Sequence, residues 1–204
     1  MIGPKEKKER RIGERLHLKG QRCDSPKCAM VKKPYPPGAH GQGRHRAPSD
    51  YGRQLREKQK VKYIYGVKEK TLWRFFQEAK REPVSTIDRL AQLLEGRLDN
   101  VIYRLGFAAS RLSARQLVSH GHIFVNGKRT RSPAMEVRPG DTITIRTESK
   151  GKVSFKDLNS KLKKFETPDW LTLDPDKLEG KIKNLPSKMD LPIELSLLVE
   201  LFSK

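Results

Sequence analysis

The sequence predicts an α+β protein with three parts: an irregular basic N-terminal arm, an all-helical domain, and a small domain of two helices packed on a short antiparallel sheet. Residues 1–48 are rich in charge, proline and glycine and poor in large apolar side chains. Residues 49–95 carry apolar residues at helical spacing. Residues 97–146 change from helical spacing to short apolar runs bounded by turn residues, which indicates strands that follow helices.

The first part, residues 1–48, is expected to be an irregular basic extension. Residues 34–38 (Pro-Tyr-Pro-Pro-Gly) favour a stiff extended segment, because proline is incompatible with a helix interior. Residues 41–46 form a glycine-rich cationic segment that contains Arg44 and Arg46. We expect this segment to become ordered on a nucleic acid, and a disordered tail that serves only solubility is the alternative.

The second part begins with a helix that Ser49 can cap and that runs to about Lys62. Its apolar residues are sparse, so its basic faces need a partner; they include Arg53, Arg56 and Lys60. A second helix is expected from about residue 68 to 80, with a stripe at i, i+3, i+4 and i+7 made of Leu72, Phe75, Phe76 and Ala79. Aromatic residues at that spacing favour a core over a surface that stacks on bases.

A third helix is expected from residue 85 to 94, after a motif of the capping-box type. Its predicted core residues are Ile87, Leu90, Leu93 and Leu94.

The third part begins with two helices. In the first, residues 98–105, one apolar stripe combines Leu98, Val101, Ile102 and Leu105. Ser110 can cap the second helix and Gly121 can end it. The buried face of this second helix is expected to consist of Ala114, Leu117 and Val118, with Arg111 and Arg115 beside it, one turn apart.

Strands follow these helices. Residues 123–125 (Ile-Phe-Val) indicate a buried strand, and Asn126-Gly127 is a strong hairpin-turn signal. Residues 139–141 (Pro-Gly-Asp) predict another turn before a strand over residues 142–145.

The end of the chain combines a basic linker with a buried helix. Residues 156–165 are expected to be that linker, and Trp170-Leu171 to dock on a hydrophobic patch. Pro192 can start a last helix whose apolar residues point nearly all round, which indicates burial in its own domain or against another protein.

The composition favours a polyanionic partner. The net charge is +20, the pI is about 10.1, and residues 1–62 hold 18 basic and 6 acidic residues, a net of +12. By contrast, residues 166–204 hold 5 basic and 8 acidic residues, a net of −3, and are expected to contact protein. We expect a cytoplasmic protein without membrane contact, because no signal peptide or long apolar segment is evident and there are only two cysteines.

Two motifs resemble one known family. The run Ser-Arg-x-x-Ala-Arg-Gln-Leu-Val-x-x-Gly-x-Ile-x-Val-Asn-Gly, residues 110–127, resembles the RNA-binding domain named after the fourth small-subunit ribosomal protein. The preceding run Arg-Leu-Asp-Asn-Val-x-Tyr-Arg-Leu-Gly-Phe, residues 97–107, is similar to the bacterial-type ribosomal protein family itself.

The resemblance covers nearly the whole chain and implies a structural protein, not an enzyme, that binds small-subunit ribosomal RNA at a multi-helix junction. It also implies early action in assembly of the subunit body. Contact with the fifth small-subunit protein near the site where messenger RNA enters, with an effect on decoding accuracy, is implied as well.

The RNA-binding domain is implied to be inserted in the helical one. The expected divisions are therefore an extension over 1–48, a helical domain over 49–94 with 166–204, an RNA-binding domain over 95–155 and a linker over 156–165. The candidate RNA-binding residues are Arg44, Arg46, Arg53, Arg56, Lys60, Arg97, Arg104, Arg111, Arg115, Gln116, His120 and Lys128. Solvated surface charge is the alternative for each arginine taken alone.

Two other functions remain open. The first is a translational repressor that binds a messenger leader through the same arginines, a second role known in this family. The second is an RNA-modifying enzyme, because Arg97-Leu98-Asp99 is similar to the catalytic motif of pseudouridine synthases. The sequence has no further segment that could build the catalytic domain of such an enzyme, which argues against it.

Cys23 and Cys28 are candidate metal ligands. Many bacterial members of the family bind zinc there through four cysteines, but the resemblance places Glu6 and Glu9 where the other two would stand. A structural zinc site needs four well-placed ligands, usually thiolate and imidazole. We therefore expect no cofactor, and interpret Cys23 and Cys28 as a remnant pair packed as small apolar residues.

We predict that the folded protein holds no stoichiometric zinc, because two of the four thiolates are missing and carboxylates replace them poorly. Elemental analysis of the purified chain should find much less than one zinc per chain. One tightly held zinc would contradict this interpretation.

Overall fold

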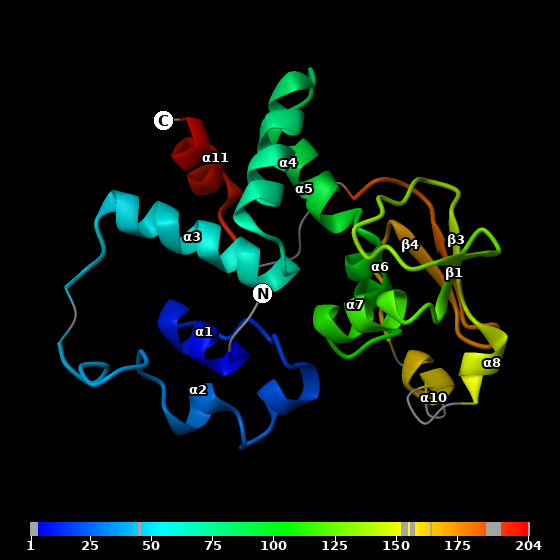
Figure 1. Cartoon of the computed structure of the whole chain (residues 1–204), viewed down its shortest axis with the longest axis horizontal. Helices are drawn as coiled ribbons and strands as arrows, with labels where there is room; N and C mark the ends of the chain where they lie inside the picture. Colours follow the sequence, from blue (N-terminus) through cyan, green and yellow to red (C-terminus); the bar gives the residue numbers. More distant parts are fainter. Residues whose placement is uncertain are drawn as a thin grey trace. The chain divides into compact units, whose positions relative to one another are not determined.

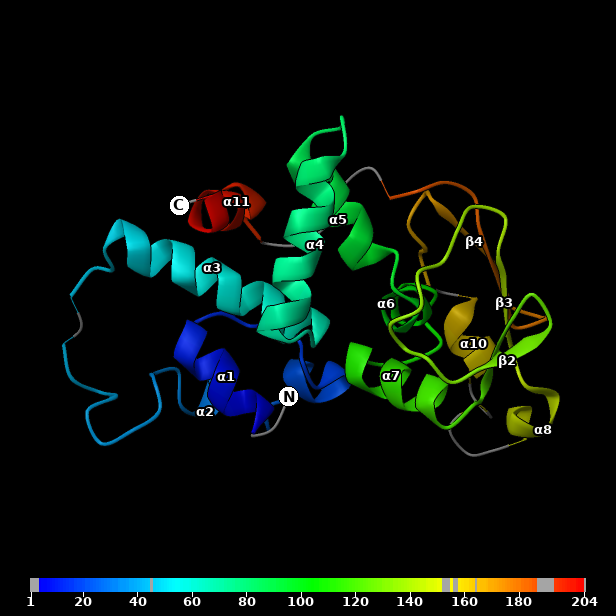
Figure 2. The ribbon, with the colours of Figure 1, turned by 45° about the horizontal axis from the view of Figure 1, so that its top comes forward.

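Helix α4 (Glu69–Arg81) carries the apolar stripe that was predicted to be core, and all four residues of the stripe are buried. Helix α11 (Leu195–Ser203) packs against α4 and against α3 (Asp50–Tyr65), as Figures 1 and 2 both show. Trp73 and Phe202 meet edge to face with ring centroids 5.2 Å apart. The predicted role of the aromatic stripe in the core is confirmed.

This computed structural model describes residues 4–44, 46–151, 155, 158–163, 165–186 and 193–203. The chain divides into two compact units, here called the first unit (1–91 with 190–204) and the second unit (92–189). The first unit is therefore discontinuous in sequence. Within the described residues, no helix is both long enough and apolar enough to cross a membrane.

Helix α3 begins where Ser49 caps it, with the Ser49 Oγ accepting a hydrogen bond from the Gly52 N–H at 3.2 Å. Helix α11 is joined to α3 by a further bond, from the Glu194 N–H to the Glu57 carboxylate at 3.1 Å. Only one side of α11 is buried, through Leu195 and Leu198. Apolar residues on its other sides are partly exposed. Pro192, the predicted start of this helix, lies outside the described residues.

The prediction of irregular structure up to residue 48 was wrong in part. The segment forms helix α1 (Lys5–Ile12), the 3₁₀ helix η1 (Gly20–Asp24) and the short helix α2 (Ala29–Lys32). The Arg10 guanidinium contributes to this order, because it donates to the Lys33 carbonyl at 2.9 Å and the Tyr35 carbonyl at 3.0 Å. The dense charge of this segment did not predict helices. The carbonyl groups that Arg10 contacts lie far from it in sequence, so a local pattern could not reveal them.

The second unit combines α5 (Thr86–Glu95), which spans the division between the units, with α6 (Leu98–Arg104) and α7 (Arg111–Ser119). The last two helices lie together on one side of a sheet (Figure 2). The predicted stripe of α6 is fully buried, and so are Ala114 and Val118 of α7, while Leu117 is partly buried. Ile87 was wrongly assigned to the core, because 37% of it is exposed near the start of α5.

The sheet is antiparallel, and its strand order in the described part of the chain is β2 (Lys128–Thr130), β1 (Ile123–Val125), β3 (Thr142–Ile145), β5 (Glu179–Ile182) and β4 (Leu171–Asp174). The predicted strands and hairpin are confirmed: β1 (Ile123–Val125) and β2 (Lys128–Thr130) flank Asn126 and Gly127, both with positive φ, and β3 is Thr142–Ile145. This conformation is that of a tight hairpin turn and favours Asn-Gly.

Residues 166–189 were wrongly assigned to the helical domain. They belong to the second unit and form β4 (Leu171–Asp174) and β5 (Glu179–Ile182), which extend the sheet beyond β3. Leu171 and Ile182 are buried in the core and Trp170 packs against it, so the predicted docking of Trp170-Leu171 is confirmed. A Cβ added to Gly180 would lie 2.4 Å from the Leu105 side chain, so Gly180 allows β5 to pack closely on Leu105, the residue that follows α6.

The expected basic linker is also more structured than predicted. Helix α10 (Leu158–Leu162) lies within the expected linker and helix α8 (Thr147–Lys150) precedes it. Phe155, Leu158 and Leu162 are buried in the core of the second unit. These three residues follow helical spacing, which the many lysines around them obscured.

Leu198 provides a test of the packing of α11. It is fully buried, so Leu198→Ala should lower the free energy of unfolding by about 2–5 kcal/mol. Ser196→Ala, at an exposed position of the same helix, is the control and should change the free energy by less than about 0.5 kcal/mol. Urea unfolding followed by circular dichroism measures the free energy of unfolding of each variant. Equal changes in the two variants would contradict the packing of α11 through Leu198.

Candidate nucleic-acid interface

The positions of the central arginines follow from how α6 and α7 are held. Helix α7 begins with a reciprocal cap, in which the Ser110 Oγ accepts from the Ser113 N–H at 3.2 Å and the Ser113 Oγ accepts from the Ser110 N–H at 3.1 Å. Burial of Ala114 and Val118 then fixes the rotation of the helix. Arg111 and Arg115 therefore lie beside the buried face, as predicted.

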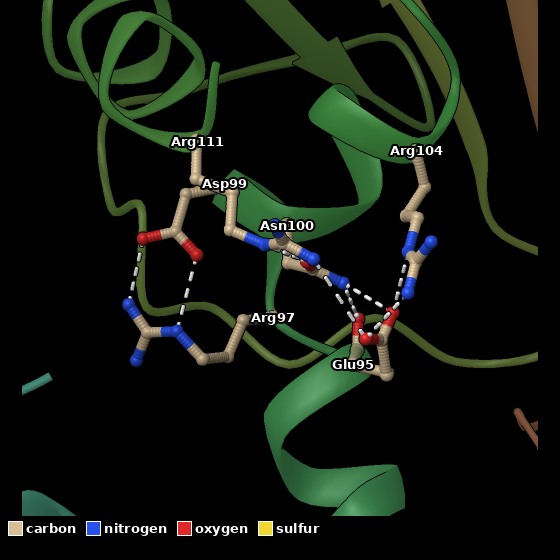
Figure 3. Close-up of polar contacts among 6 residues, drawn as sticks. All are labelled: Glu95, Arg97, Asp99, Asn100, Arg104 and Arg111. Carbon is tan, nitrogen blue, oxygen red and sulfur yellow. Dashed lines mark hydrogen bonds and ion pairs between the residues drawn. The ribbon is translucent and has the colours of Figure 1, made fainter. Parts of the chain in front are cut away.

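The first of two charged clusters surrounds Glu95, the last residue of α5 (Figure 3). Arg104 donates from Nε and Nη2 to the two carboxylate oxygens of Glu95, each at 3.0 Å. Asn100 donates from Nδ2 to Glu95 Oε2 and to the Glu95 carbonyl, both at 2.8 Å. The Glu95 side chain is 1% exposed, so a buried carboxylate is stabilised by charge-assisted hydrogen bonds.

Arg111 joins the same cluster through Asn100. Its Nε donates to Asn100 Oδ1 at 2.7 Å, and its Nη2 lies 3.9 Å from Glu95 Oε1. Its guanidinium also lies over the Tyr103 ring, 4.5 Å from the centroid. A cation–π contact and a fixed hydrogen bond together restrict the guanidinium to one orientation.

The second cluster surrounds Asp99. Arg97 donates from Nε and Nη2 to the two oxygens of Asp99, at 3.1 and 2.7 Å (Figure 3). Arg115 Nη1 lies 3.6 Å from Asp99 Oδ2. The Arg97 and Asp99 side chains are only 4% and 5% exposed, whereas 47% of the Arg115 side chain is exposed. Arg115 is therefore the member of this cluster that a ligand can reach.

Each cluster joins one carboxylate to two guanidinium groups, and so each set of three side chains carries a net charge of +1. A fixed guanidinium presents its donors in a planar fork that matches a phosphate. The arrangement is suited to binding phosphates at defined positions.

The structure brings together four of the predicted RNA-binding residues, Arg97, Arg104, Arg111 and Arg115. Gln116 and His120 are exposed at the end of α7, and Lys128 is exposed on the β1–β2 hairpin. Arg44, Arg46, Arg53 and Arg56 are exposed in the first unit, where Arg53 also pairs with Asp50.

Two of the predicted residues are buried in ion pairs. Arg97 is 3% exposed and Lys60 is 4% exposed. Lys60 Nζ lies 2.7 Å from Glu57 and 2.9 Å from Glu14. Burial lowers the pKa of Lys60, but its hydrogen bonds to Glu57 and Glu14 outweigh burial and the pKa is raised. Both residues therefore suit internal pairing better than direct contact with a ligand.

Sequence reasoning missed the acceptors that organise these arginines. Glu95, Asn100 and Tyr103 were not singled out, although Glu95 and Asn100 are each only 1% exposed. A signal did exist, since Glu95, Asp99 and Asn100 lie within a segment that also holds Arg97 and Arg104. Spacing alone did not show that the polar side of α6 is buried.

The two cysteines do not lie in a site that fits zinc. Cys23 and Cys28 are buried, and Cys23 Sγ lies 3.9 Å from Glu9 Oε1, which also accepts from the Leu18 N–H at 3.0 Å. Glu6 is instead paired with Lys19 and Arg22. Among the described residues, no three His, Cys, Asp or Glu side chains are grouped to hold a metal. Burial raises the pKa of the Cys23 thiol, which favours the protonated form over a thiolate ligand.

Comparisons with known proteins agree on one family. Residues 1–95 match the family described as Ribosomal protein S4/S9 N-terminal domain, and residues 96–143 match the S4 domain. Small ribosomal subunit protein uS4 of Thermus thermophilus is 48% identical over 205 residues, which cover 100% of this chain and 98% of that protein.

Two further relatives are similar over nearly their whole length. The protein of the same name from Syntrophomonas wolfei is 48% identical over 197 residues, 96% of this chain and 94% of that protein. Small ribosomal subunit protein uS4A of Alkaliphilus oremlandii is 51% identical with the same coverage.

We expect the buried Arg97–Asp99 pair to stabilise the folded protein. Arg97→Ala leaves a buried carboxylate without its bidentate partner, and should lower the free energy of unfolding by about 3–5 kcal/mol. Arg115→Ala removes an exposed partner of the same carboxylate, so it is a matched control with an expected loss below about 1 kcal/mol. Chemical denaturation measures the difference, and similar losses for the two variants would refute a special role for the buried pair.

Proposed function

Because the chain belongs to the family of small ribosomal subunit protein uS4, whose members are structural and not enzymes, we propose that it binds small-subunit ribosomal RNA as a permanent scaffold. The arginine clusters around Glu95 and Asp99 carry this proposal. They lie in the second unit, which contains the segment matched by the S4 domain.

The chemistry of the clusters supports binding to folded RNA. Double-stranded RNA is recognised mainly through its shape and its backbone, and fixed guanidinium groups can bind phosphates at a set spacing. Arg115 is the most accessible arginine of the four, with 47% of its side chain exposed. Gln116 follows Arg115 directly and His120 lies five residues after Arg115, and both positions are exposed.

We assign direct RNA contact in the second unit to Arg104, Arg111, Arg115, Gln116, His120 and Lys128. In the first unit we assign it to Arg44, Arg46, Arg53 and Arg56, which are exposed. Arg97 and Lys60 are assigned an indirect role, since their charges are used in buried ion pairs. The net charge of +20 adds a general attraction to polyanions that is independent of sequence.

The same membership leads us to propose binding at a multi-helix junction of the subunit body and an early role in its assembly. We also propose contact with the fifth small-subunit protein near the site where messenger RNA enters, with an influence on decoding accuracy. These roles rest on the family, and the charge distribution is compatible with them.

The Arg97-Leu98-Asp99 segment takes no part in catalysis. Asp99 is buried and held by both nitrogens of the Arg97 fork, so it is a structural carboxylate. The similarity of this segment to a pseudouridine synthase motif is thus a coincidence of sequence in a non-enzymatic protein.

Arg115→Ala tests the proposed function. We expect it to weaken binding to small-subunit ribosomal RNA by about 1–2 kcal/mol, the contribution of a charge-assisted contact. The slope of log affinity against log salt should flatten by roughly 0.7–0.9 for each phosphate that the variant no longer neutralises. Titrations of the full chain across a salt series measure both.

The control is Arg138→Ala, which removes the same charge from an exposed position in the turn before β3. We expect Arg138→Ala to lose less affinity for the ribosomal RNA than Arg115→Ala. If the two variants lose the same affinity, RNA binding depends on general electrostatic attraction and not on the position of Arg115. Tighter binding of the wild-type chain to a messenger leader than to ribosomal RNA would favour a translational repressor instead.

A further inference from the structure

Glu95 is an unexpected residue in an RNA-binding unit. A carboxylate repels phosphate, and burying one costs free energy unless it is paired. Nevertheless the Glu95 side chain is 1% exposed and lies among Asn100, Arg104 and Arg111 (Figure 3). Its presence there calls for a role that an apolar residue could not fill.

The hydrogen bonds make the placement of two arginines depend on Glu95. Arg104 is held directly, by a bidentate pair at 3.0 Å. Arg111 is held through Asn100, which accepts from Arg111 Nε at 2.7 Å while it donates to Glu95 at 2.8 Å. The amide of Asn100 is therefore fixed in orientation by the carboxylate and the backbone carbonyl of Glu95 together, and this orientation presents Oδ1 to Arg111.

Glu95 also lowers the local positive charge. With Arg104 and Arg111 it forms a set with a net charge of +1 instead of +2. General attraction to any polyanion grows with the number of cationic groups that can neutralise phosphates. A fixed geometry with less charge favours ligands whose phosphates match it over ligands that only carry charge.

We propose that Glu95 is a positioning residue that makes RNA binding selective, because it fixes the guanidinium groups of Arg104 and Arg111 and offsets one of their charges. This inference rests on the proposed RNA-binding function and deepens it. Asn100 transmits the effect to Arg111, and the Tyr103 ring supports the guanidinium from one face.

A Glu95→Gln variant of the full chain tests the proposal, since glutamine keeps the shape and removes the charge. Two RNAs are the probes: the small-subunit ribosomal RNA, and a transcript of equal length and composition with a shuffled sequence. The dissociation constant for the ribosomal RNA should rise about tenfold, the effect of losing one charged hydrogen bond. The dissociation constant for the shuffled RNA should stay the same or fall. The ratio of the shuffled-RNA constant to the ribosomal-RNA constant, which measures selectivity, should therefore fall by at least about tenfold.

The matched control is Glu148→Gln, which makes the same change in charge at a side chain that is 69% exposed. It should leave the selectivity ratio unchanged. Arg111→Lys is a second variant, which keeps the charge and loses the fork that Asn100 orients. It should weaken binding to the ribosomal RNA and leave binding to the shuffled RNA unaltered, and it keeps the proposal testable if Glu95→Gln fails to fold.

The proposal is overturned if the dissociation constants for the two RNAs change equally in Glu95→Gln, or in Arg111→Lys if the first variant is unfolded. Glu95 would then have a structural role only. A wild-type chain that shows no preference between the two RNAs would instead contradict the proposed function itself. The two failures are therefore distinguishable.

Discussion

Pairing between buried carboxylates and guanidinium groups is the interaction on which the second unit depends. Helices α6 and α7 are only seven and nine residues long, and helices this short are not stable alone in water. Glu95 joins the end of α5 to both, through Arg104 on α6 and through Asn100 and Arg111. The apolar core sets how closely these helices pack, and the charged network sets which groups they present.

The same principle operates in the first unit, with the signs reversed. There a lysine is central, because Lys60 is buried between Glu57 and Glu14, and Glu57 also accepts from the backbone at the start of α11. A fraction of the positive charge is thus used inside the protein. Net charge consequently overstates the charge available to RNA, and burial decides which arginines and lysines can reach a phosphate.

Local pattern predicted the elements whose stabilising contacts are close in sequence. The stripes of α4 and α6, the Ser49 and Ser110 caps and the Asn126-Gly127 hairpin all have their determinants within a few residues. Helix α1, helix α10 and strands β4 and β5 were missed or misplaced. Their contacts are with groups distant in sequence. Arg10 donates to carbonyls more than twenty residues away, and β5 pairs with β3 although α8 and α10 lie between them in the sequence.

The sequence alone determined the family, the α+β class, the excess of positive charge and the identity of four central arginines, because these depend on residue types and their spacing. Only the tertiary structure decided the role of each arginine. Arg97 and Arg115 were both predicted to contact RNA, yet one is enclosed with Asp99 and the other is half exposed. The reason is physical: desolvation depends on what folds over a side chain, and those covering residues come from other parts of the chain.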